Sequence, residues 1–516
     1  MTKPVRQRRL ADDSERRKVK SGDLRPDAFF FPLALLFFCL VLPVFAQKPD
    51  GKEIENALRK SVGFYREQLA AEGGYLWKYS ADLTLREGEN VADARTVWVQ
   101  PPGTPTIGRT FLRAFHVTGD RYYLEAAVEA GHCLVQGQLE SGGWTYTIFF
   151  DPAQRKKYRY RVEGAKSSSK ARNVSTLDDN TTQAALVFLM ELDEALEFKD
   201  VAIHDAVRYG LEKLLEAQYP NGAFPQGFLG EKRDPSEYPV LKANFPPKGV
   251  EPTREKDYWK FYTFNDGLVR DVNHVFFVAA EIYGSERDGI VHRNEKYVEA
   301  AEKLGDFMIA AQLPEPQPGW AQQYDFNMRP CWARKFEPAS VTGGESQSVI
   351  NALIELYWFT GKKKYLEPIP SAIRYFENSR LADGTVARFY EMRTNKPLFM
   401  TRQYELTYSD DDLPTHYSFS VKFGSWPIEE YLKMNEGARL KRQAEFRDRY
   451  RQRSFSKVDD RETTNVIRSL DKRGAWVTKG VLKAAPGKNP QSIIDNAVFV
   501  RNVNRLLDAL HATGSK

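Results

Sequence analysis

The sequence has few of the residues from which common active sites are built. It contains 3 cysteines and 7 histidines among 516 residues, and their spacing does not match a zinc site. A serine-nucleophile elbow and a phosphate-binding glycine loop are also missing. These absences argue against zinc, serine-nucleophile and nucleotide-phosphate sites. We therefore expect any metal here to be a hard cation held by oxygen ligands.

A surplus of positive charge is also missing from most of the chain. The formal net charge is +6, but residues 1–46 alone carry nine Lys and Arg against five Asp and Glu. The remainder is nearly balanced, so the charge gives no reason to expect a nucleic-acid partner.

A long apolar run lies near the N-terminus, at residues 29–47. It is short for a membrane span, and it ends in the small-residue spacing of Val44 and Ala46, which is typical of a signal-peptide cleavage site. We predict a signal peptide over residues 1–46 and a secreted or periplasmic protein without stable membrane insertion; an uncleaved anchor is the alternative. After cleavage, Cys133 and Cys331 would remain, and the sequence does not fix whether they pair.

A helical hairpin recurs along the chain. An amphipathic helix followed by a Gly-aromatic or Gly-aliphatic turn is found at 64–77, 123–146, 206–226, 297–324 and 365–390. Between these copies, segments 182–196, 272–284 and 348–361 are apolar on nearly every face, as buried helices are. The alternation predicts an all-α fold, an incomplete α/α toroid over residues 47–430, with 431–516 as a helical extension packed on it. A TPR-type solenoid is the alternative.

In such a toroid, every loop that leads from an outer helix to the next inner helix lies at the same end. Polar residues that are far apart in sequence should meet there: Asp178, Asp179, Asn180, Asn265, Asp266, Arg334, Arg388 and Arg402. Two acidic helix N-termini that open into one cavity could share Ca²⁺, and three arginines at one rim indicate bidentate capture of carboxylates. Taken singly, the aspartates could be helix N-caps and the arginines surface ion pairs.

The stretch 319–337 is irregular and rich in aromatic residues, and it carries both Asp325 and Arg334. Prolines at 318 and 330 prevent one continuous helix, so the stretch is typical of a site-forming loop. We expect Asp325 to contact substrate and Trp320 to offer a flat surface for a sugar ring, although tryptophans of such turns also pack between helices.

Five motifs carry a resemblance to a known family: STLDDNTTQ, AQYPNGAFPQ, FYTFNDG, GWAQQYDFNMRPCWARKFE and ARFYEMRTNKPLFMTRQYE. Over about residues 64–511, the chain resembles the pectic acid lyases of polysaccharide lyase family 10. The resemblance implies a secreted lyase that cleaves polygalacturonate by β-elimination with calcium.

The resemblance also implies roles for single residues. Arg334 would remove the C5 proton, Asp266 and one of Asp178 and Asp179 would hold or approach calcium, and Arg388 and Arg402 would bind uronate carboxylates. The family's second acidic motif commonly reads Asn-Asp-Asp, whereas this chain has Gly267 at the third position.

Two other functions remain compatible with the sequence. One is an inverting glycoside hydrolase, in which Asp178 or Asp179 would form the carboxyl pair with Asp325. The other is a non-catalytic surface protein that captures acidic glycans. For the lyase we expect a monomer whose partner is polygalacturonate or a related uronan.

Overall fold

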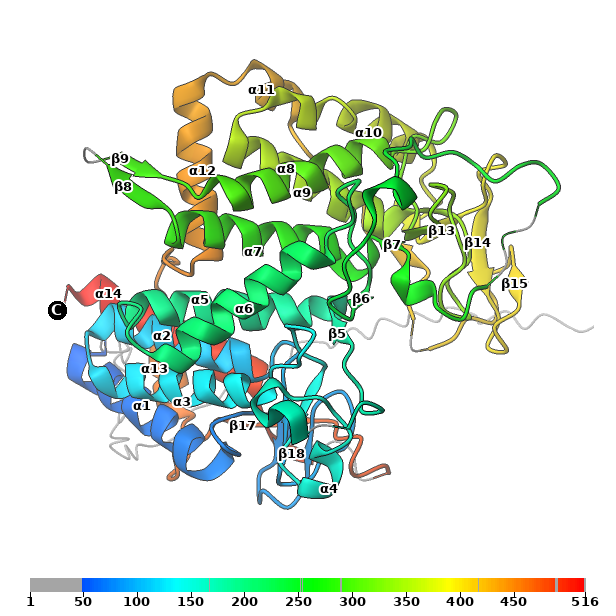
Figure 1. The fold of residues 1–516 in the computed structure, drawn as a ribbon. Coiled ribbons are helices and arrows are strands. Elements are labelled where there is room, and N and C mark those ends of the chain that lie inside the picture. Colours follow the sequence, from blue (N-terminus) through cyan, green and yellow to red (C-terminus); the bar gives the residue numbers. More distant parts are fainter. Residues whose placement is uncertain are drawn as a thin grey trace, which may run out of the picture. The chain divides into compact units, whose positions relative to one another are not determined.

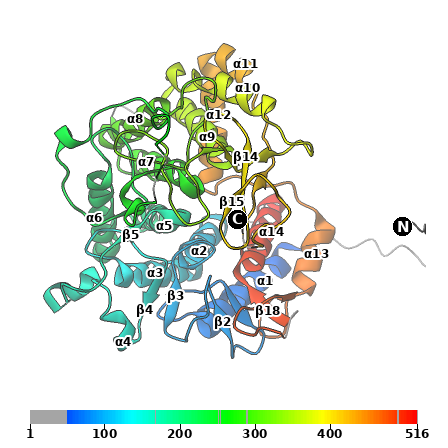
Figure 2. The same ribbon diagram turned by 90° about the vertical axis from the view of Figure 1, so that its right-hand side faces the viewer.

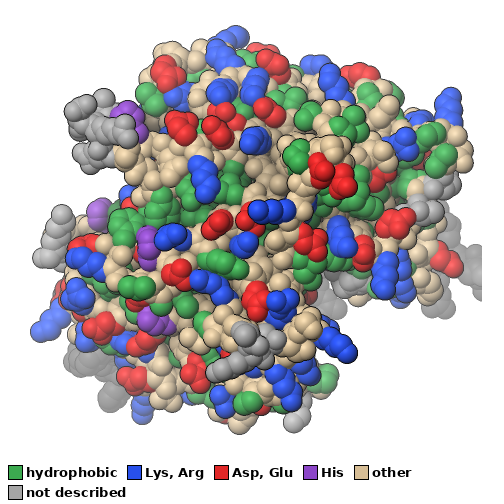
Figure 3. Space-filling view, in the orientation of Figure 1, with side chains coloured by type: hydrophobic (Ala, Val, Ile, Leu, Met, Phe, Trp, Pro, Cys, Tyr) green, Lys and Arg blue, Asp and Glu red, His purple; other side chains and the backbone are tan. Residues whose placement is uncertain are grey.

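The computed structural model describes residues 49–514, apart from 167, 251, 253, 288, 289, 416 and 488–490. The predicted signal peptide, residues 1–46, lies outside the described residues. Within them, no helix combines the length and apolar character needed to cross a membrane. Charged side chains of both signs are interspersed over the face shown in Figure 3, as the near-balanced composition predicts.

The helices form an inner and an outer arc (Figure 2). The inner helices are α2 (Thr104–Thr118), α5 (Thr181–Ala195), α7 (Leu268–Ile282), α9 (Gly343–Thr360) and α14 (Asn496–Thr513). The outer helices are α1 (Gly51–Phe64), α3 (Arg121–Gly137), α6 (Val201–Ala217), α8 (Glu295–Ala310) and α10 (Ile369–Asn378). This arrangement is an incomplete α/α toroid, so the predicted fold class is confirmed.

The segments that are apolar on nearly every face form inner helices, because an inner helix is covered by its neighbours over most of its surface. Helix α5 buries Leu186, Phe188 and Leu189 at successive angles around its axis. Gly108 of α2 allows a close approach to α5, since a Cβ there would lie 2.3 Å from the Phe188 ring. Outer helices bury one face only, and α3, α6 and α8 each begin at an Asp or Asn whose side chain caps the first turn.

Short antiparallel strands tie the loops together at one end of the ring (Figure 1). In each hairpin, the strand before the inner helix pairs with the strand after the outer helix. These pairs are β3 (Thr96–Trp98) with β4 (Thr147–Phe149), β5 (Ser175–Thr176) with β6 (Gly227–Phe228), and β7 (Tyr262–Thr263) with β10 (Gln323–Tyr324). For α9, β11 (Val341–Thr342) opens a sheet that continues through β13 (Phe389–Tyr390), β14 (Pro397–Met400) and β15 (Leu406–Thr407). Beside it, β12 (Val386–Ala387) pairs with β16 (Ser420–Val421).

The same rule joins the two ends of the described chain. Strand β18 (Gln491–Asp495), which precedes α14, pairs with β1 (Lys78–Ser80), which follows α1, in a sheet with β17 (Val477–Gly480) and β2 (Arg86–Glu87). Helices α14 and α1 are therefore one hairpin of the ring. The described residues from Pro49 onward form one compact unit, and the segment after residue 430, predicted to pack on the toroid as an extension, supplies one of its inner helices.

The remaining elements lie in connections. Helix α12 (Glu436–Tyr450) stands across the end of the ring opposite the strands and packs on α9 (Figure 1). The others are α4 (Pro152–Arg155), α11 (Ile428–Lys433), α13 (Asp460–Arg468) and the hairpin of β8 (Ser285–Arg287) with β9 (Ile290–His292). Single turns of π- or 3₁₀-helix span Tyr65–Leu69, Arg161–Lys166, Pro235–Glu237, Tyr258–Lys260 and Lys363–Leu366. Cys133 and Cys331 are both buried and free, so they do not pair.

Candidate active site

Two matching turns open the inner helices α5 and α7. Turn η3 (Asp178–Asn180) places Asp179 and Asn180 at φ 49° and 57°, and turn η6 (Asn265–Gly267) places Asp266 and Gly267 at φ 48° and 80°. Left-handed backbone costs about 1–3 kcal/mol at a residue other than glycine, and such strain clusters at functional sites. The shared conformation makes Asp179, rather than Asp178, the counterpart of Asp266.

These aspartates do not serve as ordinary helix caps. Neither α5 nor α7 has a side-chain hydrogen bond at its N-cap, in contrast to the outer helices α3, α6 and α8. The capping alternative therefore does not account for them.

The three aspartates instead form a carboxylate cluster. Asp178, Asp179 and Asp266 each offer an oxygen that lies within 4.8 Å of the others. Burial, followed by the charges of Asp178 and Glu89, raises the pKa of Asp179 to about 6. Burial, followed by the charges of Asp178 and Asp179, raises the pKa of Asp266 to about 7. Like charges held this close require protons or a cation to balance them.

Asn265 connects the two turns. Its Nδ2 donates to Asp178 Oδ1 at 3.1 Å and to Asp266 Oδ2 at 2.6 Å. Its Oδ1 is buried and has no hydrogen-bond partner among the described residues. Tyr146 adds a hydrogen bond from its hydroxyl to Asp178 Oδ2 at 2.8 Å. The cluster is therefore held in place by neutral donors and contains an amide oxygen with unused acceptor capacity.

Arg334 is held beside the cluster by Glu337. Its Nε donates to Glu337 Oε2 at 2.8 Å, and its Nη2 lies 2.7 Å from Oε1 of the same carboxylate. The same Nη2 lies 3.5 Å from Asp266 Oδ2. Burial lowers the pKa of Arg334, but the hydrogen bond and charge of Glu337, with the charges of Asp178 and Asp266, outweigh it and raise the pKa above its usual value. The guanidinium is thus oriented, and protonated as long as these charges remain.

Arg388 lies close enough to the carboxylate cluster for the charge of Asp266 to act on it. Its guanidinium lies over the Tyr417 ring at 4.3 Å, and its Nη2 is 3.5 Å from Glu345 Oε1. Burial lowers its pKa, but the charges of Glu345, Tyr417 and Asp266 together raise it. Arg402 is placed differently, since its side chain is 64% exposed and forms an ion pair with Asp412 at 3.2 Å.

Three other residues singled out from the sequence are not members of the carboxylate cluster. Trp320 is fully buried and donates from Nε1 to the carbonyl of Met308 at 2.7 Å, so its ring belongs to the core and is closed to a sugar. Asp325 accepts hydrogen bonds from the backbone at 327 and 329 and lines a separate depression beside Cys331. Asn180 lines a cavity inside the ring.

Several residues of the site escaped the sequence analysis. Glu337 lies three residues after Arg334, a spacing that could have suggested the pair. Gln100, which donates to Asp179 Oδ2 at 2.9 Å, and Tyr146 come from the neighbouring hairpin. No local pattern marks them. Together these groups can hold a hard cation and, next to it, a carboxylate of a bound molecule.

Comparisons with known proteins agree with this chemistry. The sequence profile of the family described as pectic acid lyase matches residues 138–419, more than half of the chain. No curated protein sequence matches the chain. Three solved structures resemble its fold at low identity, and the family assignment rests on the sequence match alone.

Two of these structures are family 10 polysaccharide lyases from Cellvibrio cellulosa. A mutant in complex with trigalacturonic acid has 19% identity and a TM-score of 0.40, covering 61% of this chain and 93% of its own. Another has 20% identity and a TM-score of 0.42, covering 63% and 96%. A D-mannose isomerase has 13% identity and a TM-score of 0.41, covering 91% and 99%.

Proposed function

The chain belongs to the pectic acid lyase family and is a pectate lyase, and we propose that its carboxylate cluster and Arg334 cleave polygalacturonate by calcium-assisted β-elimination. The observation that carries this proposal is the convergence of three carboxylates within 4.8 Å, with the Arg334 guanidinium 3.5 Å from one of them. A cation site beside an oriented guanidinium matches a substrate that bears a carboxylate on every sugar.

Arg388 supports a uronan as substrate. Its guanidinium is held by Tyr417 and Glu345 and can present paired N–H groups to a carboxylate. The trigalacturonic acid bound to the Cellvibrio lyase is a short uronan of this kind. We assign Arg388 to a uronate carboxylate in both the ground state and the transition state. Arg402, being exposed and ion-paired, would contact an outlying sugar.

The residues of the cluster fit calcium. Asp178, Asp179 and Asp266 supply only oxygen ligands, which Ca²⁺ prefers, and Asn265 Oδ1 is a buried oxygen without a partner among the described residues. When bound, Ca²⁺ would offset part of the negative charge of the cluster and of the uronate carboxylate, and so stabilise the negative charge that develops as the C5 proton leaves. Tyr146 and Gln100 would keep the ligand carboxylates oriented.

Arg334 would take the C5 proton. The elimination then forms a C4=C5 double bond and breaks the bond from C4 to the glycosidic oxygen, which leaves with the electron pair and gains a proton. Glu337 engages Nε and Nη2 of Arg334 and leaves Nη1 without a hydrogen bond to a described residue. Two of the charges that raise the Arg334 pKa, those of Asp178 and Asp266, belong to the proposed calcium ligands. Neutralising the cluster would remove these two contributions, whereas the hydrogen bond and charge of Glu337, the largest that raise the Arg334 pKa, would remain.

The alternative functions have less support. An inverting hydrolase needs a second carboxylate across the sugar, and Asp325, the candidate for it, caps its own turn outside the cluster. A purely glycan-binding protein could use the carboxylate cluster to hold a cation, but it would not need the Arg334 guanidinium that Glu337 orients beside the cluster.

An ultraviolet assay on a panel of uronans tests the proposal. The full-length protein should release unsaturated product from polygalacturonate, chelator should abolish the signal, and added Ca²⁺ should restore it. Product formation that is unchanged by chelator would contradict the proposed role of calcium. Export is part of the proposal, and N-terminal sequencing of the exported protein should find Gln47 first; an intact Met1 on membranes would support an anchor.

A further inference from the structure

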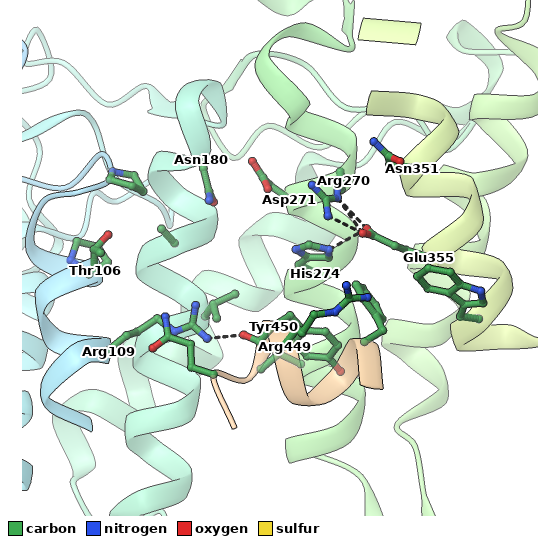
Figure 4. Close-up of a pocket in the computed structure, with 18 residues that line it drawn as sticks. Thr106, Arg109, Asn180, Arg270, Asp271, His274, Asn351, Glu355, Arg449 and Tyr450 are labelled. Carbon is green, nitrogen blue, oxygen red and sulfur yellow. Dashed lines mark hydrogen bonds and ion pairs between the residues drawn. The ribbon is translucent and has the colours of Figure 1, made fainter. Parts of the chain in front are cut away.

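A cavity of about 600 Å³ lies inside the helical ring, between its inner helices (Figure 4). Its lining residues recur at helical spacing on one face of each helix, as Arg270, His274 and Val278 do on α7. Asn180, the last residue of turn η3, lines it next to the carboxylate cluster, and residues of α12 line it at the opposite end. This axial cavity thus adjoins the cluster but is built from other side chains.

A carboxylate without a partner faces this cavity. Asp271 accepts no hydrogen bond and forms no ion pair with any described residue, because its neighbour Arg270 directs Nε and Nη2 to Glu355 instead. In Figure 4, Asp271 and Asn180 point into the space between α7 and α5. A half-buried carboxylate that no protein group satisfies is available to hydroxyl donors of a ligand.

Positive groups line the same cavity. Arg270 binds Glu355 through Nε and Nη2 at 2.6–3.0 Å, which leaves Nη1 without a hydrogen bond to a described residue. Glu355 is further anchored by His274 Nε2 at 3.0 Å. Arg449 of α12 forms no ion pair with a described residue and is exposed, so the cavity reaches solvent beside it. The cavity therefore offers guanidinium donors to an anion and Asp271 to hydroxyl groups.

The remaining walls are apolar or amide. Pro105, Trp358 and Phe446 supply flat apolar surface, and Asn351 supplies an amide. Apolar walls with a few convergent polar groups, in a volume of 300–1,000 Å³, describe a site for a small molecule. A sugar acid matches all three features, because it has an apolar ring face, hydroxyl groups and one carboxylate.

We propose that the axial cavity binds a free hexuronate, with its carboxylate at Arg449 and Arg270 and its hydroxyl groups at Asp271 and the amides. This site is separate from the cluster at which the polymer is cleaved. Because the proposal stands on the cavity alone, it does not depend on the lyase activity.

Calorimetric titration of D-galacturonate into the full-length protein, with chelator present so that the cluster holds no metal, tests this site. We expect saturable binding of one molecule per chain, at least tenfold tighter than that of galactose, which lacks the carboxylate. Asp271→Asn and Arg449→Gln should each weaken binding about tenfold or more. Asp271→Asn keeps the side-chain shape and breaks no contact, so the variant should fold.

Two control variants locate the binding. Arg447→Gln removes an exposed arginine of the same helix that does not line the cavity, and it should leave affinity unchanged. Asp266→Asn changes the cluster and should also leave affinity unchanged. Absence of saturable binding, equal affinity for galactose, or a loss with Asp266→Asn but not with Asp271→Asn would overturn the proposal. Matched circular dichroism and melting curves exclude unfolding as the cause of any loss.

Discussion

Replacing Asp266 with asparagine should stabilise the calcium-free protein at neutral pH and remove its stabilisation by calcium. The substitution removes one of three crowded carboxylates but keeps the side-chain shape. Asparagine also tolerates the left-handed backbone of turn η6, where Asp266 has φ 48°. The amide oxygen can still accept the hydrogen bond from Asn265.

The magnitude follows from the raised pKa of Asp266. A shift from the usual 3.8 to about 7 corresponds to about 4 kcal/mol at full effect. The Asp266 side chain is 30% exposed, and solvent screening reduces this figure, so we expect about 1–2 kcal/mol. Because the folded-state pKa is raised, the folded protein binds this proton more tightly than the unfolded chain does. The contribution is favourable below pH 4 and is lost as the pH rises through about 7.

Urea unfolding in chelator at pH 5 and pH 8 measures the effect. Wild type should lose more free energy of unfolding between the two pH values than Asp266→Asn, and Asp410→Asn, an exposed carboxylate outside the cluster, serves as the control. Calcium at a hundredfold over its dissociation constant should then stabilise wild type by about 2.7 kcal/mol, and the variant much less. A variant that is less stable than wild type at pH 8 in chelator, or equally stabilised by calcium, would refute the reasoning.

Four further substitutions separate the roles of these residues. Arg334→Lys should lower kcat on the order of 10²–10⁴-fold with KM nearly unchanged, because lysine keeps the charge but not the guanidinium geometry; near-normal turnover would contradict the base role. In initial-rate kinetics, Arg388→Ala should raise KM by an amount corresponding to about 1.5–3 kcal/mol, whereas exposed Arg402→Ala should change it less than about threefold. Trp320→Phe should lower the free energy of unfolding in urea by about 1–2 kcal/mol, because the hydrogen bond to Met308 is lost, and should leave kcat unchanged. A large loss of kcat would instead indicate that Trp320 contacts the substrate.

The sequence allowed the ring and the location of the site to be predicted. Helices α5, α7 and α9 are apolar on nearly every face, which is typical of an inner ring, and the recurring hairpin then sends every loop before an inner helix to one end. That geometry accounts for the meeting of Asp179, Asp266 and Arg334 across more than 150 positions of sequence. The hairpin of α14 with α1 was missed, because its two helices lie at opposite ends of the chain.

Finer features of the site depend on conformation that composition does not encode. The match of Asp179 with Asp266 appears only in their left-handed φ values. A tryptophan after a Gly turn can either stack against a sugar ring or pack in the hydrophobic core, and Trp320 packs in the core. The exposure of Arg402, which lies in the turn between β14 and β15, depends on the path of these strands, which no helical period determines.

The ratio of unsaturated ends to new reducing ends tests the central claim most directly. In a digest of polygalacturonate, each β-elimination creates one unsaturated uronate for each new reducing end, so the account predicts a ratio of one throughout the reaction. Reducing ends that accumulate without ultraviolet absorbance would show that the chain hydrolyses its substrate, and would contradict the account.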